Sequence, residues 1–319
     1  MNPPALETRG LTKRFGKSPV VDDLSLAVPV GSVCGLLGNN GAGKTTTIRM
    51  LMGHLYPSAG SVLTLGVDPH HQREETLQRI AYVSESMRLP WWMTVGGALR
   101  MNASLFPKWE ARRADQLLDA FDLSRKSRFG LMSSGQRRKT LLLLALCQGA
   151  ELLIFDEPAN GLDLESRRAF LDCVLDLALE GNRTVLLSSH ILSDLERVVD
   201  RIILLRKGRL LHSGVLDELK SGTRRLFVPL RLERSVFDEH FRVHAYEADE
   251  AGGTTATVLD FSDAAWLRFL SALPGEIRPD AREYGLNLEE LYLEFAGNRT
   301  RRPRDRGMRN EEIPMTNDK

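Results

Sequence analysis

The chain has few cysteines, no apolar run long enough to cross a bilayer, and almost no net charge. Its three cysteines, Cys34, Cys147 and Cys173, lie far apart in apolar surroundings. They have neither the spacing of metal ligands nor that of a disulfide framework, so we expect buried, reduced thiols. The longest apolar stretch, Leu141–Cys147, is far too short for a membrane span, and the first residues lack the apolar core of a signal peptide. These absences predict a soluble, cytoplasmic protein.

The charge balance excludes a general attraction to polyanions. Lysine and arginine number 43 against 42 acidic residues, which leaves a net charge of +1. Such a balance gives no general case for binding nucleic acid or an anionic membrane surface. With 319 residues, of which 42% are hydrophobic and 27% charged, the chain suits one large domain or two ordinary ones with a buried core.

Strand-like and helix-like segments alternate through the first two thirds of the chain. The strand candidates are Val33–Leu37, Ile80–Val83, Leu152–Phe155, Thr184–Ser188 and Ile202–Leu205. The helix candidates between them are Thr45–Met52, Arg112–Phe121, Gln136–Cys147, Glu165–Glu180 and Leu192–Val199. This alternation predicts an α/β fold with a mostly parallel sheet and helices on both faces.

Both ends of the chain depart from that pattern. Leu6–Phe15 and Val20–Val28, separated by a short turn, predict an antiparallel pair. From about residue 223 we expect a smaller α/β domain with strands at Leu226–Leu232 and Thr254–Asp260 and helices at Asp263–Leu273 and Leu288–Phe295. We therefore divide the chain into residues 1–222, 223–297 and an Arg-rich, disordered tail at 298–319. That tail could touch anionic lipid or a partner, although a solvated tail is the simpler interpretation.

A glycine-rich loop between a strand and a helix is the clearest chemical motif. It consists of Gly38, Asn39, Asn40, Gly41, Ala42, Gly43, Lys44, Thr45 and Thr46, and it matches G-x-x-x-x-G-K-[ST] in the required context. Glycines let backbone N–H groups converge on phosphate oxygens, and the helix dipole adds to the attraction. Lys44 would reach the β and γ phosphates, and the Thr45 hydroxyl would ligate Mg²⁺. The pattern predicts a nucleoside triphosphate site, in preference to an ordinary glycine-rich turn.

Two acids at the end of another apolar strand supply the rest of a hydrolysis site. Asp156, which follows Leu152–Phe155, is placed to hold Mg²⁺, and Glu157 could accept a proton from the attacking water. A structural pair with an arginine is the alternative. His190 follows the strand Thr184–Ser188 and could contact the γ-phosphate, although a lone histidine there is usually a polar surface residue.

A second anion-binding element opens the helix candidate at Gln136–Cys147. Ser133, Ser134, Gly135 and Gln136 are small or polar residues at a helix N-terminus, which favours an anion. The glycine-rich loop already binds the phosphates in this chain, so this second segment would bind a nucleotide held by another subunit. An ordinary serine-capped helix start is the alternative.

Together these motifs resemble the ATP-binding subunits of ABC transporters. The resemblance covers most of residues 5–220 and includes the P-loop, the signature at Met132–Gln136, the Asp156–Glu157 pair, the D-loop at Asn160–Asp163 and the switch residue His190. It implies a P-loop ABC ATPase cassette with a mostly parallel core sheet, an antiparallel β subdomain and a helical subdomain at about residues 86–145. It also implies ATP and Mg²⁺ as cofactors, and a head-to-tail dimer with each ATP between one P-loop and the partner's signature.

The resemblance assigns further roles and shows two departures. Phe15 matches the aromatic residue that stacks on adenine. Glu85 replaces the glutamine that links Mg²⁺ and water to the transporter; a carboxylate can still ligate Mg²⁺ but repels the γ-phosphate, unless the register of that loop differs. Ser134 replaces a glycine of the signature, and we expect it to be tolerated.

The insert after Glu85 contains the adjacent tryptophans Trp91 and Trp92. In the family this insert receives a coupling helix of the permease, so the tryptophans suit an interface, but burial within the helical subdomain is equally compatible with the sequence.

The ending Leu286–Leu293 resembles ATPases of ABC-2-type exporters, which work with separate permeases. We therefore predict the ATP-hydrolysing motor of a bacterial exporter, attached to the inner face of the membrane through its permease. The partner cassette could be an identical or a different chain.

A soluble ABC ATPase acting on nucleic acid or ribosomes is the alternative, disfavoured because the chain has one cassette and no heptad run. A GTPase or small-molecule kinase lacks support because no Asn-Lys-x-Asp motif occurs.

Overall fold

A six-stranded sheet forms the centre of the molecule in a computed structural model that describes residues 3–71, 77–180, 183–189, 191–249 and 252–296. Its strands lie in the order β5 (Ile80–Val83), β6 (Leu152–Asp156), β7 (Thr184–Ser188), β3 (Val33–Leu37), β8 (Arg201–Arg206) and β9 (Arg209–Val215). The first five are parallel and β9 pairs antiparallel with β8. The mostly parallel core sheet is thus confirmed, and β9 is an edge strand that the sequence analysis did not identify.

Each face of this sheet has its own apolar core, because successive side chains of a strand point to opposite faces. On β6, Leu153 and Phe155 join one cluster while Leu152 and Ile154 join the other. The first cluster is covered by α5 (Ser134–Leu146), α6 (Leu164–Leu179) and α7 (Leu192–Leu195). The second is covered by α1 (Lys44–Leu51) and by a separate antiparallel sheet. Strands buried on both faces explain the continuous apolar runs in the sequence.

The antiparallel sheet has the order β2 (Ser18–Val28), β1 (Leu6–Phe15) and β4 (Ala59–Thr64). Its β1–β2 hairpin confirms the antiparallel pair, although β2 begins at Ser18, two residues earlier than expected. Strand β4 was not predicted. Gly60 has φ +81°, and a Cβ there would meet the carbonyl oxygen of Gly10 at 2.3 Å. Only glycine therefore allows the backbones of β4 and β1 to approach this closely.

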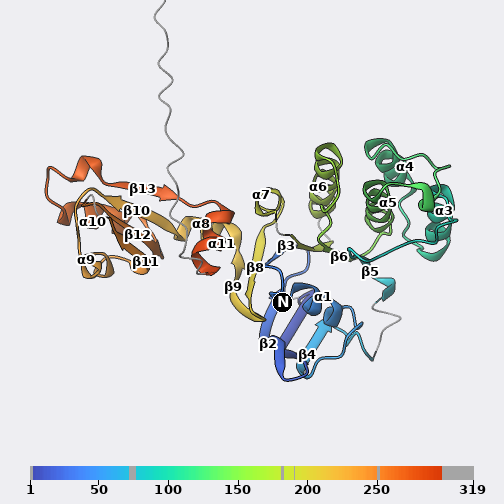
Figure 1. Ribbon diagram of the computed structural model, residues 1–319, viewed down its shortest axis with the longest axis horizontal. Helices are drawn as coiled ribbons and strands as arrows, with labels where there is room; N and C mark the ends of the chain where they lie inside the picture. The colour runs from blue at the N-terminus through green and yellow to red at the C-terminus, as the bar shows by residue number, and fades with distance from the viewer. Residues whose placement is uncertain (1–2, 72–76, 181–182, 190, 250–251, 297–319) are drawn as a thin grey trace, which may run out of the picture.

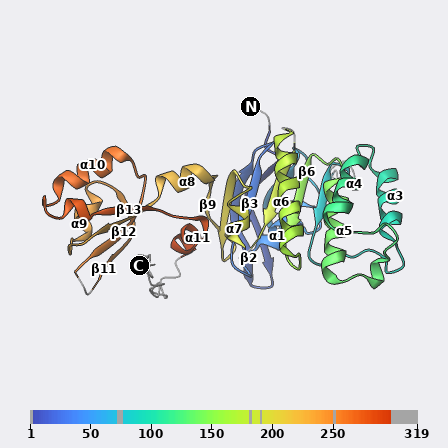
Figure 2. The ribbon, with the colours of Figure 1, turned by 90° about the horizontal axis from the view of Figure 1, so that it is seen from above.

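Helices α3 (Val95–Leu105), α4 (Ala111–Ala120) and α5 form a layer beyond β5. The helix α3 begins at the N-cap Thr94, whose side chain accepts a hydrogen bond from the amide of Gly97. Figures 1 and 2 show these helices at one end of the elongated molecule, past the central sheet. They lie where the helical subdomain was expected.

The opposite end of the molecule holds a four-stranded antiparallel sheet. Its order is β11 (Arg242–Ala248), β12 (Thr254–Leu259), β10 (Arg224–Val228) and β13 (Arg282–Gly285), and it is reached through α8 (Leu216–Gly222). The helices α9 (Arg234–Asp238) and α10 (Asp263–Ala272) cover it, with Phe237 and Phe269 fully buried between them and the sheet. The expected strand Leu226–Leu232 ends at Val228, because Pro229 cannot donate a ladder hydrogen bond.

The helix α11 (Leu288–Ala296) returns from this end to the central part of the molecule (Figure 1). Its buried residues Leu288, Leu291 and Tyr292 belong to the core cluster that covers α7, and not to the core of the four-stranded sheet. Helix α7 itself ends at Leu195, four residues before the end expected from the sequence.

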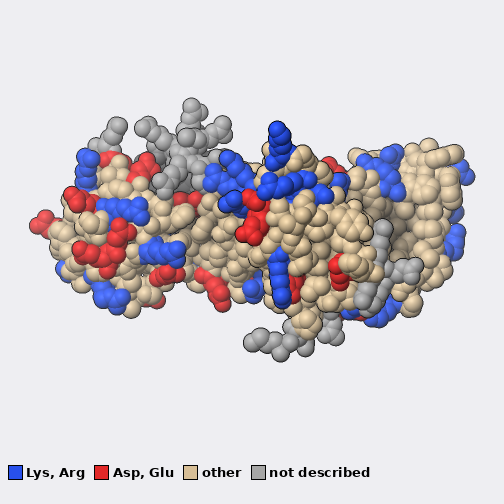
Figure 3. Space-filling view, turned by 90° about the horizontal axis from the view of Figure 1, so that it is seen from below, with Lys and Arg blue, Asp and Glu red and all other residues tan. Residues whose placement is uncertain are grey.

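Basic and acidic side chains both occur on the face shown in Figure 3, over the four-stranded sheet and over the central part. Among the described residues, no helix is both long enough and apolar enough to cross a bilayer. The proposed tail at 298–319 lies outside the described residues.

Candidate functional site

The glycine-rich loop connects the carboxyl end of β3 to the first turn of α1, as the sequence predicts. At Gly38, a Cβ would meet the Cβ of Ala42 at 2.7 Å and the carbonyl oxygen of Leu205 at 2.8 Å. Gly43 has φ +102°, and a Cβ there would meet the carbonyl oxygen of Val20 at 2.8 Å. The tight curl of the loop therefore depends on glycine at both positions. Gly43 is also the N-cap of α1, and no side chain caps that helix, so its first N–H groups are open to an external acceptor.

Lys44 folds back over its own loop. Its side chain is 7% exposed, and its Nζ donates a 2.7 Å hydrogen bond to the carbonyl oxygen of Gly38. The same Nζ lies 3.5 Å from Oε1 of Glu157. The structure thus brings together two residues that are far apart in sequence and that we had assigned to the same reaction. Thr45 is exposed and Thr46 is half-buried at the start of α1.

Asp156 is the last residue of β6, and its carboxylate is held by the neighbouring strand. The hydroxyl of Ser188, at the end of β7, donates a 2.6 Å hydrogen bond to Oδ1 of Asp156. The Ser188 Oγ also accepts a 3.0 Å hydrogen bond from the backbone amide of Glu157. Ser188 therefore holds the carboxylate of Asp156 and the backbone of Glu157. Asp156 is only 4% exposed, and this hydrogen bond gives its buried carboxylate a defined direction.

Glu157 has a left-handed backbone, with φ +53°. This conformation is unfavourable for a residue with a Cβ and persists where the surroundings impose it, often at functional sites. Its carboxylate faces Lys44.

Arg138 is a buried residue that the sequence analysis missed. It lies on α5 and is 7% exposed. Among the described residues, its hydrogen-bond acceptors are all backbone carbonyls. Its acceptors are the oxygens of Ser84 at 2.8 Å, Asp156 at 3.0 Å, Glu157 at 2.5 Å and Pro158 at 3.2 Å. A guanidinium presents five donors in a fixed plane, which suits it to join several carbonyls at once. Arg138 therefore ties the segments that follow β5 and β6 to the helix behind the signature.

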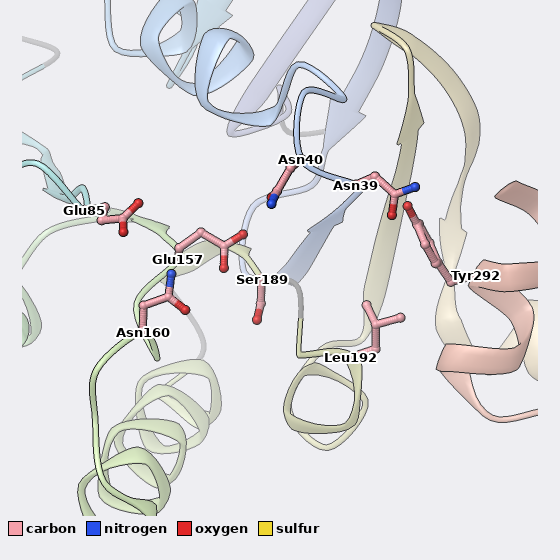
Figure 4. Close-up of a pocket in the computed structure, with 9 residues that line it drawn as sticks. Asn39, Asn40, Glu85, Glu157, Asn160, Ser189, Leu192 and Tyr292 are labelled. Atoms are coloured by element: carbon pink, nitrogen blue, oxygen red, sulfur yellow. The ribbon is translucent and has the colours of Figure 1, made fainter.

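These elements surround a cavity of about 380 Å³. Figure 4 shows Asn39 and Asn40 on one side, with Glu157, Asn160 and Ser189 opposite them and Glu85 at one end. Leu192 and Tyr292 also line it. Tyr292 and Asn160 were not predicted as cavity residues. Asn160 follows the Asp-Glu pair and was assigned only to the D-loop, whereas Tyr292 comes from α11 and carries no local signal of proximity.

Phe15 is not among the described residues that line this cavity, and His190 is not described. Phe15 is 56% exposed at the end of β1, with Nζ of Lys13 5.4 Å from the centre of its ring. It is not among the residues that line the cavity. His190 lies outside the described residues, but its neighbour Ser189 lines the cavity. The adenine-stacking role of Phe15 and the switch role of His190 stay predictions.

The signature segment starts α5 with a capping box. The Ser133 hydroxyl accepts a hydrogen bond from the amide of Gln136, and Oε1 of Gln136 accepts one from the amide of Ser133. At Gly135 a Cβ would meet the carbonyl oxygen of Gly161 at 2.8 Å, so the D-loop and the signature are in close contact. The serine-capped helix start is therefore correct as a local description.

The structure does not bring the signature to the P-loop of the same chain. Ser133, Ser134 and Gln136 are exposed, and Ser134 lines a second cavity of about 260 Å³ with Arg137, Arg138 and Gly161. Glu85 is exposed and lines both cavities.

Trp91 and Trp92 both point away from the protein core, with 73% and 59% of their surfaces exposed. The backbone beside them is fixed: the carbonyl oxygen of Trp91 accepts a 2.8 Å hydrogen bond from the amide of Gly130, and that of Met93 accepts one from Phe129. The segment is thus anchored through its main chain, and of the two possibilities left by the sequence, burial of a tryptophan in the helical layer is wrong.

Comparison with known proteins identifies the family. Residues 21–160 match the model of the ABC transporter family. The chain is 34% identical over 254 residues to the bacitracin transport ATP-binding protein BcrA of Bacillus licheniformis, covering 77% of this chain and 83% of that protein. It is 36% identical over 233 residues to the daunorubicin/doxorubicin resistance ATP-binding protein DrrA of Streptomyces peucetius, covering 72% of this chain and 70% of that one.

A solved structure of the ATP-binding subunit of an ABC transporter superposes with a TM-score of 0.63 at 32% identity, over 68% of this chain and 92% of the other. The α/β cassette with its mixed sheets is the same fold. The chain therefore belongs to the ABC transporter family, in which it is an ATP-binding subunit with ATPase activity.

Proposed function

We propose that this ATPase is the motor of an exporter. ATP binding closes a head-to-tail dimer, hydrolysis reopens it, and the cycle drives a separate permease that holds the protein at the inner face of the membrane. Each ATP lies between the P-loop of one subunit and the signature segment, Ser133–Gln136, of the other.

The position of the signature carries this proposal. Ser133, Ser134 and Gln136 are exposed at the N-terminus of a 13-residue helix, a place that favours an anion. They do not line the cavity that contains Asn39, Asn40 and Glu157. The N-terminus of α5 therefore cannot bind the phosphates of a nucleotide held by the P-loop of the same chain. It could bind the phosphates of a nucleotide held by a second subunit.

Residues in the cavity and beside it are proposed to hold a magnesium nucleotide. In this proposal the uncapped start of α1 and Lys44 bind the phosphates, while Thr45 and Asp156 provide the protein oxygens for Mg²⁺, which prefers a few such ligands together with substrate phosphates. Asp156 already has its Oδ1 oriented by Ser188. Glu157 is the general base, and Glu85 and His190 contact the metal and the γ-phosphate. Phe15 stacks on the adenine.

The exposed tryptophans provide the permease contact. Trp91 and Trp92, together with Leu131 at 87% exposed, form an apolar patch on the helical layer whose backbone is fixed by hydrogen bonds. Tryptophans in such a setting act as interface anchors. We assign this patch to a helix on the cytoplasmic side of the permease.

The direction of transport rests on the relatives. Two of them are named for bacitracin transport and for daunorubicin/doxorubicin resistance, and a third, at 32% identity, for Nod factor export. These names support export and favour transport over the alternative of a soluble ABC ATPase acting on nucleic acid or ribosomes.

The division of the chain is also part of the proposal. Residues 1–222 are the nucleotide-binding domain, and residues 223–297 are an accessory domain whose sheet has its own core around Phe237 and Phe269. The last helix of this range, α11, packs on the core of the nucleotide-binding domain.

A mixing experiment tests the composite site. Lys44→Ala removes the P-loop cation, and Ser133→Arg blocks the signature, so each variant alone should lack activity. In a mixed head-to-tail dimer one site keeps both an intact P-loop and an intact signature. Random pairing then restores about a quarter of the wild-type rate. If the mixture hydrolyses ATP no faster than the separate variants, the head-to-tail homodimer is wrong, and a different partner cassette must supply the signature.

A further inference from the structure

The short helix α7 forms part of the wall of the nucleotide cavity. It has only four residues, and the first of them, Leu192, lines the cavity together with Ser189. Figure 4 shows both side chains across from Asn39 and Asn40 of the P-loop. A helix of one turn is not stable by itself, because fixing its backbone costs more than its first hydrogen bond contributes. Contacts with other elements must therefore hold this wall in place.

Glu196, directly after α7, makes two such contacts with a single carboxylate. Its Oε1 accepts a 2.6 Å hydrogen bond from Nζ of Lys220, in the last turn of α8. Its Oε2 accepts a 3.2 Å hydrogen bond from the backbone amide of Leu288, the first residue of α11. A carboxylate is favourable at a helix N-terminus, because the first amides of a helix have no acceptor within it. Glu196 therefore joins α7 to two further helices.

These two helices are the connections between the cassette and the C-terminal sheet. Helix α8 leads from β9 to β10, and α11 follows β13. Leu219 of α8 and both Leu288 and Leu291 of α11 are buried in the same apolar cluster as Leu195 of α7. Both connections thus belong to the core that contains α7, and the carboxylate of Glu196 binds one residue of each.

We infer that Glu196 is a positioning residue for ATP hydrolysis: it ties α7, and the cavity wall formed by Ser189 and Leu192, to both connections of the C-terminal sheet. The backbone between them is itself constrained, because the amide of Ile191 donates a 2.9 Å hydrogen bond to Oγ of Ser189. The proposed switch residue His190 belongs to this segment of the sequence. The inference rests on the proposed nucleotide site but not on the dimer or the permease. It gives the accessory domain a role in the turnover of the cassette.

Glu196→Ala is the direct test, because it removes both acceptor oxygens from a side chain that is 22% exposed. The wall that contains Ser189 lies across the cavity from the P-loop, which would bind the phosphates. We therefore expect kcat at saturating ATP to fall by about fivefold, the effect of one hydrogen bond of ordinary net strength, while KM changes less than about twofold. Glu218→Ala, at an exposed acidic residue of α8, is the matched control and should change neither value.

A second measurement does not depend on ATP turnover. In the nucleotide-free protein, hydrogen exchange at the Leu288 amide should be about tenfold faster in Glu196→Ala than in wild type or in Glu218→Ala, as expected when a hydrogen bond to a charged acceptor is lost. Glu196→Gln keeps one acceptor oxygen and should change kcat and exchange in the same direction by smaller factors. This variant provides the same test if Glu196→Ala does not fold.

The two measurements separate the possible failures. Equal exchange of the Leu288 amide in wild type and Glu196→Ala would overturn the inference, because the carboxylate would then not hold α11. Faster exchange with an unchanged kcat would show that the contact does not serve hydrolysis, and the positioning role would be wrong. Wild-type ATP hydrolysis by Lys44→Ala would instead contradict the proposed nucleotide site, and with it the positioning role, while faster exchange in Glu196→Ala would still support the contact with α11.

Discussion

Nζ of Lys44 lies 3.5 Å from Oε1 of Glu157, and both side chains are largely buried. The lysine follows β3 and the glutamate follows β6, so two separate strand ends place a cation beside the proposed general base. A cation in this position attracts the carboxylate and orients it towards the P-loop side of the cavity, where the proposed general base would act.

Glu157→Gln should reduce ATP hydrolysis by about 10²–10⁴-fold, the usual contribution of a general base. The amide keeps the size of the side chain, so ATP binding should persist. Phosphate release and the ATP dissociation constant measure the two effects. Glu151→Gln is the control, because Glu151 immediately precedes the same strand and pairs with Arg79 away from the cavity. Equal hydrolysis rates in wild type and Glu157→Gln would exclude the assigned role.

Arg138→Lys should lower both stability and turnover. Lysine cannot reproduce the planar set of hydrogen bonds to four backbone carbonyls, and the released carbonyls stay buried or partly buried. We expect a loss of about 2–3 kcal/mol in the free energy of unfolding and a lower kcat, because the Glu157 backbone loses a support. Denaturant titration and steady-state kinetics measure these effects.

Arg137→Lys is a matched control for that experiment. Arg137 is adjacent on the same helix but donates to the carbonyls of Phe129 and Gly130 in the helical layer. The Arg137→Lys substitution should leave kcat within about twofold of wild type, because the hydrogen bonds of Arg137 do not involve the backbone around Glu157. If both variants lose turnover equally, the carbonyl contacts of Arg138 are not the cause.

Replacing Trp91 and Trp92 by serine should separate ATP hydrolysis from coupling. Both rings are exposed, so the isolated subunit should hydrolyse ATP within about twofold of the wild-type rate. Recovery of the subunit with membranes that contain the co-expressed permease proposed above should fall by at least about tenfold, as expected for the loss of aromatic anchors. Leu267→Ser, at an exposed leucine of α10, is the control and should not affect recovery. Undiminished recovery of the tryptophan variant would move the permease contact elsewhere.

His212 should make the protein less stable as the pH falls. Burial lowers its pKa from the ordinary value of 6.5, and its buried Nε2 has no hydrogen-bond partner among the described residues. Below pH 6.5 the unfolded chain takes up a proton that the folded histidine resists. Its contribution to stability is therefore complete above that pH and is lost as the pH falls through it.

His212→Gln removes this titration. Between about pH 7.5 and about pH 5.5, the free energy of unfolding should fall further for wild type than for the variant. Urea titrations at the two values measure the difference, which isolates His212 from the acidic groups that the two proteins share. Identical pH dependence would contradict the effect of burial on this histidine.

The sequence was most informative where a motif and its supporting strand are contiguous. The loop from Gly38 to Thr46, the strand before Asp156 and the helix after Ser133 each carry their own local signals, and the structure has them at nearly the expected bounds. The buried parallel strands were identifiable because both of their faces are apolar.

Contacts between distant segments had no such signal. Arg138 looks like an ordinary arginine of an amphipathic helix, and only the fold shows that its guanidinium reaches the carbonyls after β5 and β6. In the sequence, Tyr292 is indistinguishable from the other core residues of the last predicted helix. Its place beside Asn39 depends on how α11 packs on α7, which periodicity does not specify. The sequence also did not predict whether Trp91 is exposed, because tryptophan occurs both in protein cores and at interfaces.

The return of α11 also affects how the protein is made. Leu288 and Leu291 complete an apolar core whose other members, such as Leu195 and Leu219, were synthesised long before. A ribosome-bound chain ending near Gly222 therefore has the P-loop, the signature and the Asp156–Glu157 pair, but it leaves that part of its core open to water. Domains generally fold as units once their chain is available, so we expect this part of the core to close only after the four-stranded sheet has emerged and α11 can reach α7.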